Sequence, residues 1–240
     1  ESAGGTRILI DTPPELRLQL IATGVDRVDA VLYTHDHADH VHGIDDLRAI
    51  TVRQGAALPV YGPADALGAI ARKFRYLFDD SVQPLPGTSK PPATIHPVEP
   101  GQPCIIGDLE IVPVTVPHGG TTVFGYRIGP AGVIPSEAKD RGPPRQHEGA
   151  ALGYVTDAKS LPPEAMRLLA GVKVLVVNAL LRTEHPTHLS LAEAVSVAAE
   201  IGAARTYLTH LTHHNFHADL ETELPSGIAP AFDGLTVRID

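Results

Sequence analysis

The segment YTHDHADHVHG, residues 33–43, places four histidines and two aspartates directly after an apolar run. In an extended segment, residues i and i+2 point to the same side, so His35 and His37 can bind one ion together. Asp39 and His40 fall where the chain is expected to turn into a helix, and they can aim at a neighbouring point. The pattern therefore predicts two adjacent sets of metal ligands at the end of a strand.

The alternative for this segment is a solvated polar loop in which the histidines have no joint role. Four histidines delivered to the edge of a sheet are costly to arrange without a ligand, so the metal site is the favoured interpretation. His42 fits neither ligand set, and we interpret it as a surface residue or as a neighbour of the ligands.

Other candidate ligands stand at the ends of apolar runs elsewhere in the chain. His118, Asp157 and His210 each follow an expected strand and precede a turn, and ligands gather at such strand ends in open α/β sheets. Any one of them alone would more often be a turn or cap residue. With the histidine segment they complete a set of seven ligands, enough for two cations: His35, His37, Asp39, His40, His118, Asp157 and His210.

The pattern of apolar runs predicts an α/β chain. Strands are expected at 7–10, 29–34, 58–62, 151–156, 172–180, 205–210 and 234–239, and helices at 13–24, 43–53, 63–78, 162–169, 190–201 and 217–224. The middle of the chain predicts an antiparallel meander with strands at 93–99, 103–106, 109–116 and 121–129. Residues 129–150 are rich in Gly, Pro and charge and predict a surface loop or insertion. No linker is visible, so we expect a single domain over residues 1–240.

The composition limits which kinds of binding partner we expect. The net charge is −9 with neutral histidines, which argues against a long nucleic acid and leaves a small anion open, because bound cations would invert the local field. No apolar run is long enough for a membrane span. The only cysteine, Cys104, is interpreted as a small buried strand residue, and a single cysteine points to a reducing compartment. We therefore expect a cytoplasmic protein without a membrane partner, and a homodimer is left open.

Six motifs together resemble the metallo-β-lactamase superfamily: ILIDT, THDHADH, VPHGG, YVTD, THLSLAEA and LTHLTHH. The resemblance runs from Arg7 to Gly234 and implies an αββα sandwich of two facing mixed sheets with a dinuclear metal centre at one edge. It implies that Asp11 supports the metal loop. The implied ligands are His35, His37 and His118 for one ion, Asp39, His40 and His210 for the other, and Asp157 as the bridge.

His188 indicates which branch of the superfamily the chain resembles. It precedes His210 by 22 residues, and a histidine here resembles the phosphodiesterase branch, which includes ribonuclease Z and the phosphoribosyl 1,2-cyclic phosphate phosphodiesterase of phosphonate breakdown. The alternative is that His188 merely flanks a helix capped by Ser190. The tail LPSGIAPAFDGLTV also resembles the cyclic phosphodiesterase type. That type normally carries a strand-containing segment before ILIDT, so we expect part of the first sheet to be absent.

The favoured hypothesis is a dinuclear metal phosphodiesterase acting on a small cyclic phosphate or a nucleotide. Asp39 would orient the attacking hydroxide, and His188 would stabilise the phosphoryl oxygens or protonate the leaving oxygen. Ligands that are all His or Asp suit Zn²⁺ or Mn²⁺. One alternative is a ribonuclease Z-like nuclease, although the chain has no room for the tRNA-binding arm of that enzyme. The others are a metal-loaded nucleotide-binding protein with little turnover and a member of the related cofactor-biosynthesis branch of the superfamily.

Further polar residues flank the expected site. Asp45, Asp46 and Arg48 are interpreted as an ordinary charged helix face, although a guanidinium such as that of Arg48 also suits a phosphate. Three more histidines are expected at the rim and mostly exposed: His213, His214 and His217.

Overall fold

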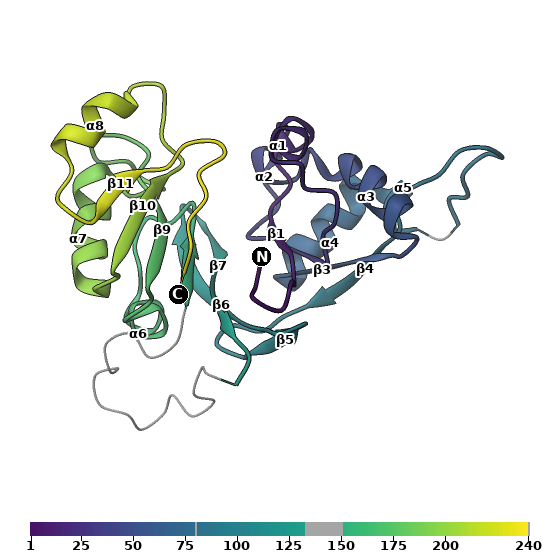
Figure 1. Ribbon diagram of the computed structural model, residues 1–240, viewed down its shortest axis with the longest axis horizontal. Coiled ribbons are helices and arrows are strands. Elements are labelled where there is room, and N and C mark those ends of the chain that lie inside the picture. The colour runs from purple at the N-terminus through teal and green to yellow at the C-terminus, as the bar shows by residue number, and fades with distance from the viewer. Residues whose placement is uncertain (80, 133–150, 240) are drawn as a thin grey trace. The chain divides into compact units, whose positions relative to one another are not determined.

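The computed structural model describes residues 1–79, 81–132 and 151–239. The chain divides into two compact units, Glu1–Glu99 and Pro100–Asp240. In Figure 1 the colour bar gives the residue numbers, so each unit can be identified by its colours. A single domain over residues 1–240 stays a prediction. Among the described residues, no helix has both the length and the apolar character required to cross a bilayer.

The first unit contains a four-stranded sheet in the order β1-β2-β3-β4, and every neighbouring pair is parallel. Its elements are β1 (Ile8–Ile10), α1 (Leu16–Thr23), β2 (Ala30–Leu32), α2 (Ala38–Val41), the 3₁₀ helix η1 (Ile44–Asp46), α3 (Leu47–Gln54), β3 (Leu58–Gly62), α4 (Ala64–Lys73), α5 (Arg75–Phe78) and β4 (Ala93–Pro97). Strand β2 is buried along its whole length, as expected for a central strand of a parallel sheet.

Alternate residues of the sheet form the core of this unit. Val31, Tyr33 and Val60 point to the face that also packs Ile50 of α3 and Ile70 of α4, and all five are at most 3% exposed. Side chains at every second position of the strands therefore pack against the apolar side chains of α3 and α4, and together they form one apolar layer. This layer fixes where strand β2 ends and where the histidine segment begins.

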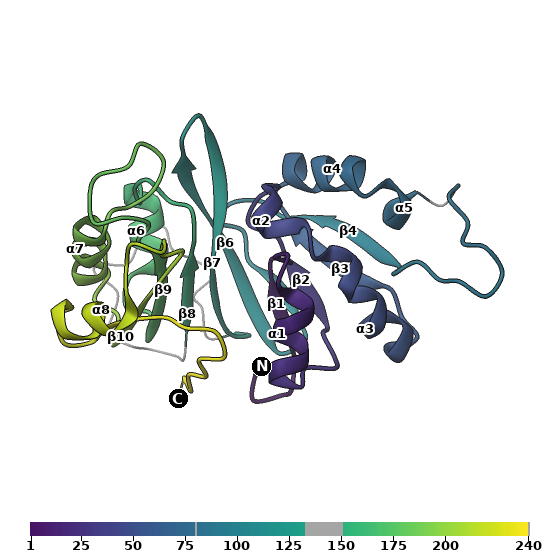
Figure 2. The same ribbon diagram turned by 90° about the horizontal axis from the view of Figure 1, so that it is seen from above.

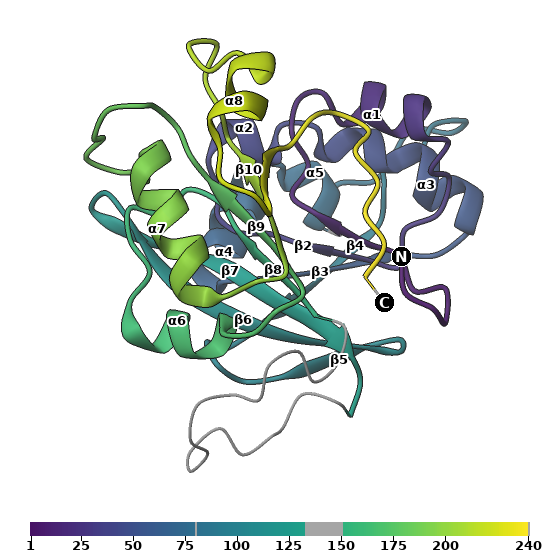
Figure 3. The ribbon, with the colours of Figure 1, turned by 60° about the vertical axis from the view of Figure 1, so that its left-hand side comes forward.

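The second unit contains a seven-stranded mixed sheet in the order β11-β10-β9-β8-β7-β6-β5. Its elements are β5 (Cys104–Ile106), β6 (Leu109–His118), β7 (Thr121–Pro130), β8 (Leu152–Val155), α6 (Pro163–Leu169), β9 (Val174–Asn178), α7 (Leu191–Ile201), β10 (Arg205–Thr209), α8 (His217–Glu223) and β11 (Ile228–Pro230). Helices α6 and α7 cover one face of strands β8 to β10 (Figures 2 and 3), where Leu169 and Ala194 pack on Leu175 and Val177.

Most expected elements are present, but four expectations are wrong. Strand β4 pairs parallel with β3 instead of joining the meander, because α4 and α5 provide the crossover that a parallel pair needs. The first sheet is consequently parallel and not mixed. The helix expected over 63–78 is interrupted at Phe74, which has a non-helical backbone. The last strand is β11, paired with β10, and residues 234–239 form no strand.

The expected loop over 129–150 lies mostly outside the described residues. Its first two residues, Gly129 and Pro130, belong to strand β7, and residues 133–150 lie outside the described part of the chain.

Helix α7 begins with a capping box. The Ser190 hydroxyl accepts a hydrogen bond from the Glu193 N–H, and the Glu193 carboxylate accepts one from the Ser190 N–H at 2.7 Å. Lys159 adds an ion pair to the same carboxylate at 2.7 Å. The hydrogen bonds from Lys159 and Ser190 lower the pKa of Glu193 to about 2. The cap thus joins the start of α7 to the segment that follows β8.

Glu193→Gln should lower the free energy of unfolding near neutral pH, because the amide keeps the shape of the cap but loses the charge that Lys159 pairs with. The folded-state pKa lies below the ordinary value of 4.5, so this contribution is present above about pH 4.5 and is lost as pH falls towards about 2. Urea unfolding of both proteins across this range should show the difference shrinking at acid pH. Glu200→Gln, on the exposed face of the same helix, is the control, and an equal pH-dependent loss there would contradict the assignment.

Candidate metal and catalytic centre

The candidate ligands stand at the carboxyl ends of strands within each unit. In the first unit, Asp11 follows β1 and the histidine segment follows the parallel strand β2. In the second unit, β6 and β8 are both antiparallel to β7 and therefore run in the same direction, and β10 is parallel to β9 and β8. His118, Asp157 and His210 accordingly lie at one edge of that sheet.

The backbone is unusual at three of these positions. Among the described residues, the non-glycine residues with positive φ are Asp11 at 57°, Asp157 at 56° and His210 at 55°. This left-handed conformation is uncommon for residues with a side chain and costs roughly 1–2 kcal/mol each. Each of these residues lies just past the end of a strand, β1, β8 or β10.

The Asp11 carboxylate organises the histidine segment. Its Oδ1 accepts a hydrogen bond from the Thr34 N–H at 2.8 Å, and its Oδ2 accepts from the Thr34 hydroxyl at 2.8 Å and from His40 Nδ1 at 2.7 Å. The Thr34 oxygen in turn accepts from His35 Nδ1 at 3.0 Å. Burial raises the pKa of Asp11, and the hydrogen bonds from His40 and Thr34 oppose that shift.

These contacts decide which ring nitrogens carry lone pairs. Because His35 and His40 each donate from Nδ1, the Nε2 atom of each ring holds the lone pair that a metal ligand needs. A carboxylate that orients a ligating histidine in this way is a common feature of metal sites. The support role that the sequence suggested for Asp11 is thus borne out by its hydrogen bonds.

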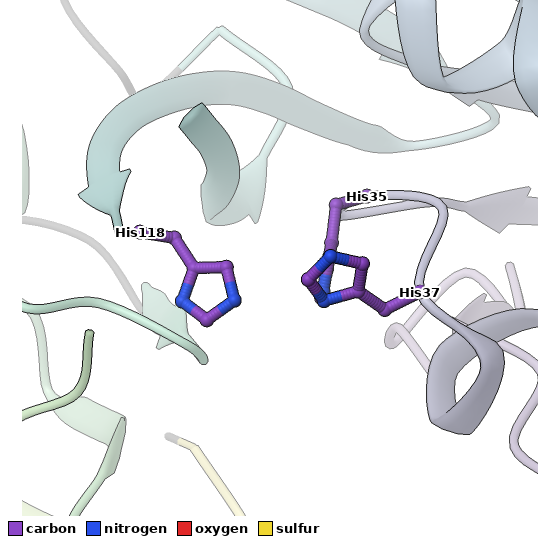
Figure 4. A group of neighbouring side chains, drawn as sticks. All are labelled: His35, His37 and His118. Carbon is purple, nitrogen blue, oxygen red and sulfur yellow. The ribbon is translucent and has the colours of Figure 1, made fainter. Parts of the chain in front are cut away.

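The four predicted ligands of the first unit are neighbours. The rings of His35 and His37 lie 4.5 Å apart between centroids (Figure 4), and those of His35 and His40 lie 4.2 Å apart. The Asp39 carboxylate lies 3.4 Å from His40 Nε2, and its side chain is 62% exposed. Helix α2 begins within this segment, as expected, and places Asp39 and His40 beyond the extended pair. His42 is exposed and contacts Phe74.

The second unit gathers its candidates around the Asp157 carboxylate. His188 Nε2 lies 2.9 Å and His210 Nε2 3.3 Å from Asp157 Oδ1, while the Thr156 hydroxyl donates to Oδ2 at 2.6 Å. Nitrogen and oxygen atoms of His118, Asp157 and His188 all lie within 4.8 Å of one another. Burial lowers the pKa of His188, and the hydrogen bond to Asp157 acts in the opposite direction.

His118 ends strand β6, and Figure 4 shows its ring projecting from the strand end. Its Nδ1 donates to the Thr187 carbonyl at 3.2 Å, so Nε2 again carries the lone pair. The tautomer of His118 is therefore set by a backbone oxygen, whereas those of His35 and His40 depend on Asp11.

Sequence reasoning missed several residues that hold the site in place. Asn178, at the end of β9, clamps the residue after Asp157: its side-chain amide accepts from the Ala158 N–H at 2.9 Å and donates to the Ala158 carbonyl at 3.1 Å. Lys73 of α4 donates to the Asp36 carboxylate at 2.6 Å and to its carbonyl. Asn178 carried a readable signal, since it is a polar residue at a strand end. Lys73 carried none, because its partner lies 37 residues away.

The other polar residues have plain structural roles. Arg48 donates to Asp45 at 2.6 Å, and Tyr76 donates to the same carboxylate at 2.6 Å, so the interpretation as a charged helix face fits the contacts. His213, His214 and His217 are exposed. Cys104 is half-buried in β5.

Comparison with known proteins assigns the family. Residues 6–211 match the model of the beta-lactamase superfamily domain. The chain belongs to the beta-lactamase superfamily. A crystal structure described as a new diphosphatase from the PhnP family is 30% identical, has a TM-score of 0.81, and aligns over 100% of this chain and 82% of its own. The fold class and the branch expected from the sequence are confirmed.

Curated relatives agree with this assignment. Ribonuclease Z of Bradyrhizobium sp. (strain ORS 278) is 28% identical over 98% of this chain and 91% of its own length. An octanoyltransferase of Porphyromonas gingivalis is 34% identical over 98% of this chain. This chain spans only 43% of that protein's length. The diphosphatase and the ribonuclease place the chain in a family of metallo-β-lactamase-fold hydrolases.

One structural neighbour is a metal-bound protein. The Zn²⁺-bound structure of PqqB from Methylobacterium extorquens has a TM-score of 0.76 and covers 100% of this chain and 85% of its own. At 16% identity it supports the fold alone. The clustered His and Asp side chains of this chain offer the imidazole and carboxylate donors that such ions take.

Asp11→Asn should weaken metal binding by about 10- to 100-fold, the usual effect of losing the partner that orients a histidine ligand. Asparagine tolerates the left-handed backbone but offers one acceptor oxygen where the carboxylate serves three donors. Competition with a chromogenic chelator measures the affinity, and circular dichroism checks the fold. Asp45→Asn is the control, because that carboxylate contacts Arg48 and Tyr76 and no candidate ligand. Equal affinities for wild type and Asp11→Asn would show that Asp11 does not orient the ligands.

Proposed function

We propose that this chain is a metal-dependent phosphodiesterase that hydrolyses a small phosphate ester, such as a cyclic phosphate or a nucleotide-like phosphodiester. Two divalent ions, Zn²⁺ or Mn²⁺, would be held by the predicted set of seven: His35, His37 and His118; Asp39, His40 and His210; and Asp157 as the bridge. The donor chemistry fits such ions, because the set contains only imidazole and carboxylate and three of its rings have Nδ1 donating elsewhere.

The proposed ions would supply a strong nucleophile at neutral pH and neutralise the phosphoryl charge. Asp39, whose carboxylate is well exposed, would accept a hydrogen bond from the attacking water and align it. His188 would give a proton from Nε2 to the leaving oxygen. The reaction would thus use the chain's own groups for alignment and proton transfer.

The observation that carries this proposal is the contact between His188 Nε2 and Asp157 Oδ1 at 2.9 Å. It puts a buried imidazole beside the carboxylate proposed to bridge the ions, without a need for that imidazole as a ligand. An ester of a sugar alcohol releases a poor leaving group, which needs a proton as it departs. A histidine at this position therefore suits phosphodiester hydrolysis better than the opening of an activated amide.

The comparisons support the same substrate class. The 30% identical neighbour is described as a diphosphatase, and a curated relative is a ribonuclease Z. Both names concern phosphorus–oxygen bonds. We propose a small substrate and not a long nucleic acid, because a net charge of −9 opposes the phosphate contacts on which nucleic-acid binding depends.

A ribonuclease Z-like activity is the second candidate, favoured by the match to 98% of this chain. The first experiment therefore combines elemental analysis of the purified protein with a substrate panel. The panel contains cyclic phosphates, bis(p-nitrophenyl) phosphate, nucleotide diphosphate esters, precursor tRNA and nitrocefin. We expect two ions per chain and turnover of small esters alone. Turnover restricted to tRNA would select the second candidate, and turnover of nitrocefin alone would exclude both.

His188→Ala and His210→Ala should differ in metal content. His210→Ala should lose an ion together with activity, since the proposed ligand shell becomes incomplete. His188→Ala should keep both ions while turnover falls by roughly 10²–10⁴-fold, the usual size of a lost acid–base group. Elemental analysis and steady-state kinetics measure the two effects. The loss in His188→Ala should shrink for substrates that release p-nitrophenolate. Loss of an ion from His188→Ala would instead identify this histidine as a ligand.

A further inference from the structure

Lys73 contacts the residue that separates two of the candidate ligands. Its ammonium group donates to the Asp36 carboxylate at 2.6 Å and also to the Asp36 carbonyl. The rings of His35 and His37, on either side of this aspartate, lie 4.5 Å apart between centroids. Along an extended segment the residue between such a pair points the other way, and here its side chain meets α4. The histidine segment is therefore held from helix α4 as well as from Asp11.

The core of the first unit fixes the position of Lys73. It is the last residue of α4 and lies three and seven positions after Ile70 and Ala66, so the three side chains share one face of the helix. Ile70 is 0% exposed and belongs to the same apolar core as Val31 of β2. The core that determines where β2 ends thus also places the ammonium group beside Asp36.

The contact with the Asp36 carbonyl bears on geometry more than on stability. That oxygen belongs to the peptide group between Asp36 and His37, whose atoms lie in one plane. A donor that holds the oxygen limits the rotation of the plane from which His37 begins. The ion pair itself contributes little to the free energy of unfolding, because the side chains of Lys73 and Asp36 are 41% and 35% exposed.

We propose that Lys73 is a positioning residue that holds the peptide group between Asp36 and His37, and so fixes how His37 meets the ion that it shares with His35. This inference rests on the proposed function, in which these two histidines bind the same ion. It assigns to a lysine outside the ligand set a direct influence on the affinity of one ion.

The role of Lys73 differs from that of Asp11. The Asp11 carboxylate contacts His40 directly and His35 through Thr34, so it orients ligands of both proposed ions. Loss of the lysine should therefore weaken the binding of one ion, whereas loss of the carboxylate should weaken the binding of both.

Lys73→Met tests the inference, because methionine keeps an apolar stem and removes the charge and the donors. We expect the affinity for one of the two ions to fall by about 10- to 100-fold, with the other affinity and the Tm little changed. Stepwise titration of the metal-free protein with Co²⁺ measures both affinities, and the visible spectrum reports the coordination of each ion. Arg75→Met is the control, since Arg75 pairs with Asp79 at 2.7 Å. Unchanged affinities in Lys73→Met, or equal weakening of both ions, would overturn the proposal.

Asp36→Asn separates the two contacts of Lys73. Asparagine removes the carboxylate and keeps the backbone carbonyl, so the loss in affinity should be smaller than in Lys73→Met. The double variant should bind no more weakly than Lys73→Met alone, because both changes act on one pair of residues. A loss in Asp36→Asn as large as in Lys73→Met would overturn the role of the carbonyl.

Turnover distinguishes this inference from the proposed function. At saturating Co²⁺, Lys73→Met should regain most of the wild-type turnover of small phosphodiesters, because the lysine acts through metal binding alone. Weakened binding of one ion in Lys73→Met, without turnover of any phosphodiester by the wild type, would leave the positioning role standing and refute the function. An active wild type with unchanged affinities in Lys73→Met would refute the positioning role and leave the function standing.

Discussion

The carboxylate of Asp11 is the contact on which the histidine segment depends. It is buried, it lies in a left-handed turn directly after β1, and it accepts three hydrogen bonds from the segment that follows β2. Parallel pairing of β1 with β2 is what brings these two strand ends together. The sheet therefore does more than bury apolar residues, because its register sets the tautomers of His35 and His40.

In the second unit, different groups orient the histidine rings. They are a backbone carbonyl and the Asp157 carboxylate. Asn178 fixes the chain after Asp157 by pairing with both polar groups of the Ala158 backbone. Buried polar groups of this kind are stable only when their partners are present. That requirement explains why the candidate site is built on strand ends, whose positions the core determines.

Sequence predicted the parts of this arrangement that depend on local pattern. The strand expected over residues 58–62 is β3, and Ser190, which the sequence offered as a helix cap, caps α7. Pairing was harder, since the partner of β4 depends on a crossover and not on the residues of β4 itself. The last strand was misplaced for a similar reason: residues 234–239 alternate as a strand would, but β10 pairs with residues 228–230.

The candidate residues could be named from sequence because their types and spacing carry chemical information, while their supports could not. The spacing of His35 and His37 indicates a joint role, but Lys73 is an ordinary residue whose partner, Asp36, lies 37 residues away along the chain. The left-handed backbone of Asp11, Asp157 and His210 was equally hidden. Glycine would relieve that strain at all three positions. It would also remove the carboxylates and the imidazole, so the chain retains a conformational cost at the points where its chemistry requires a side chain.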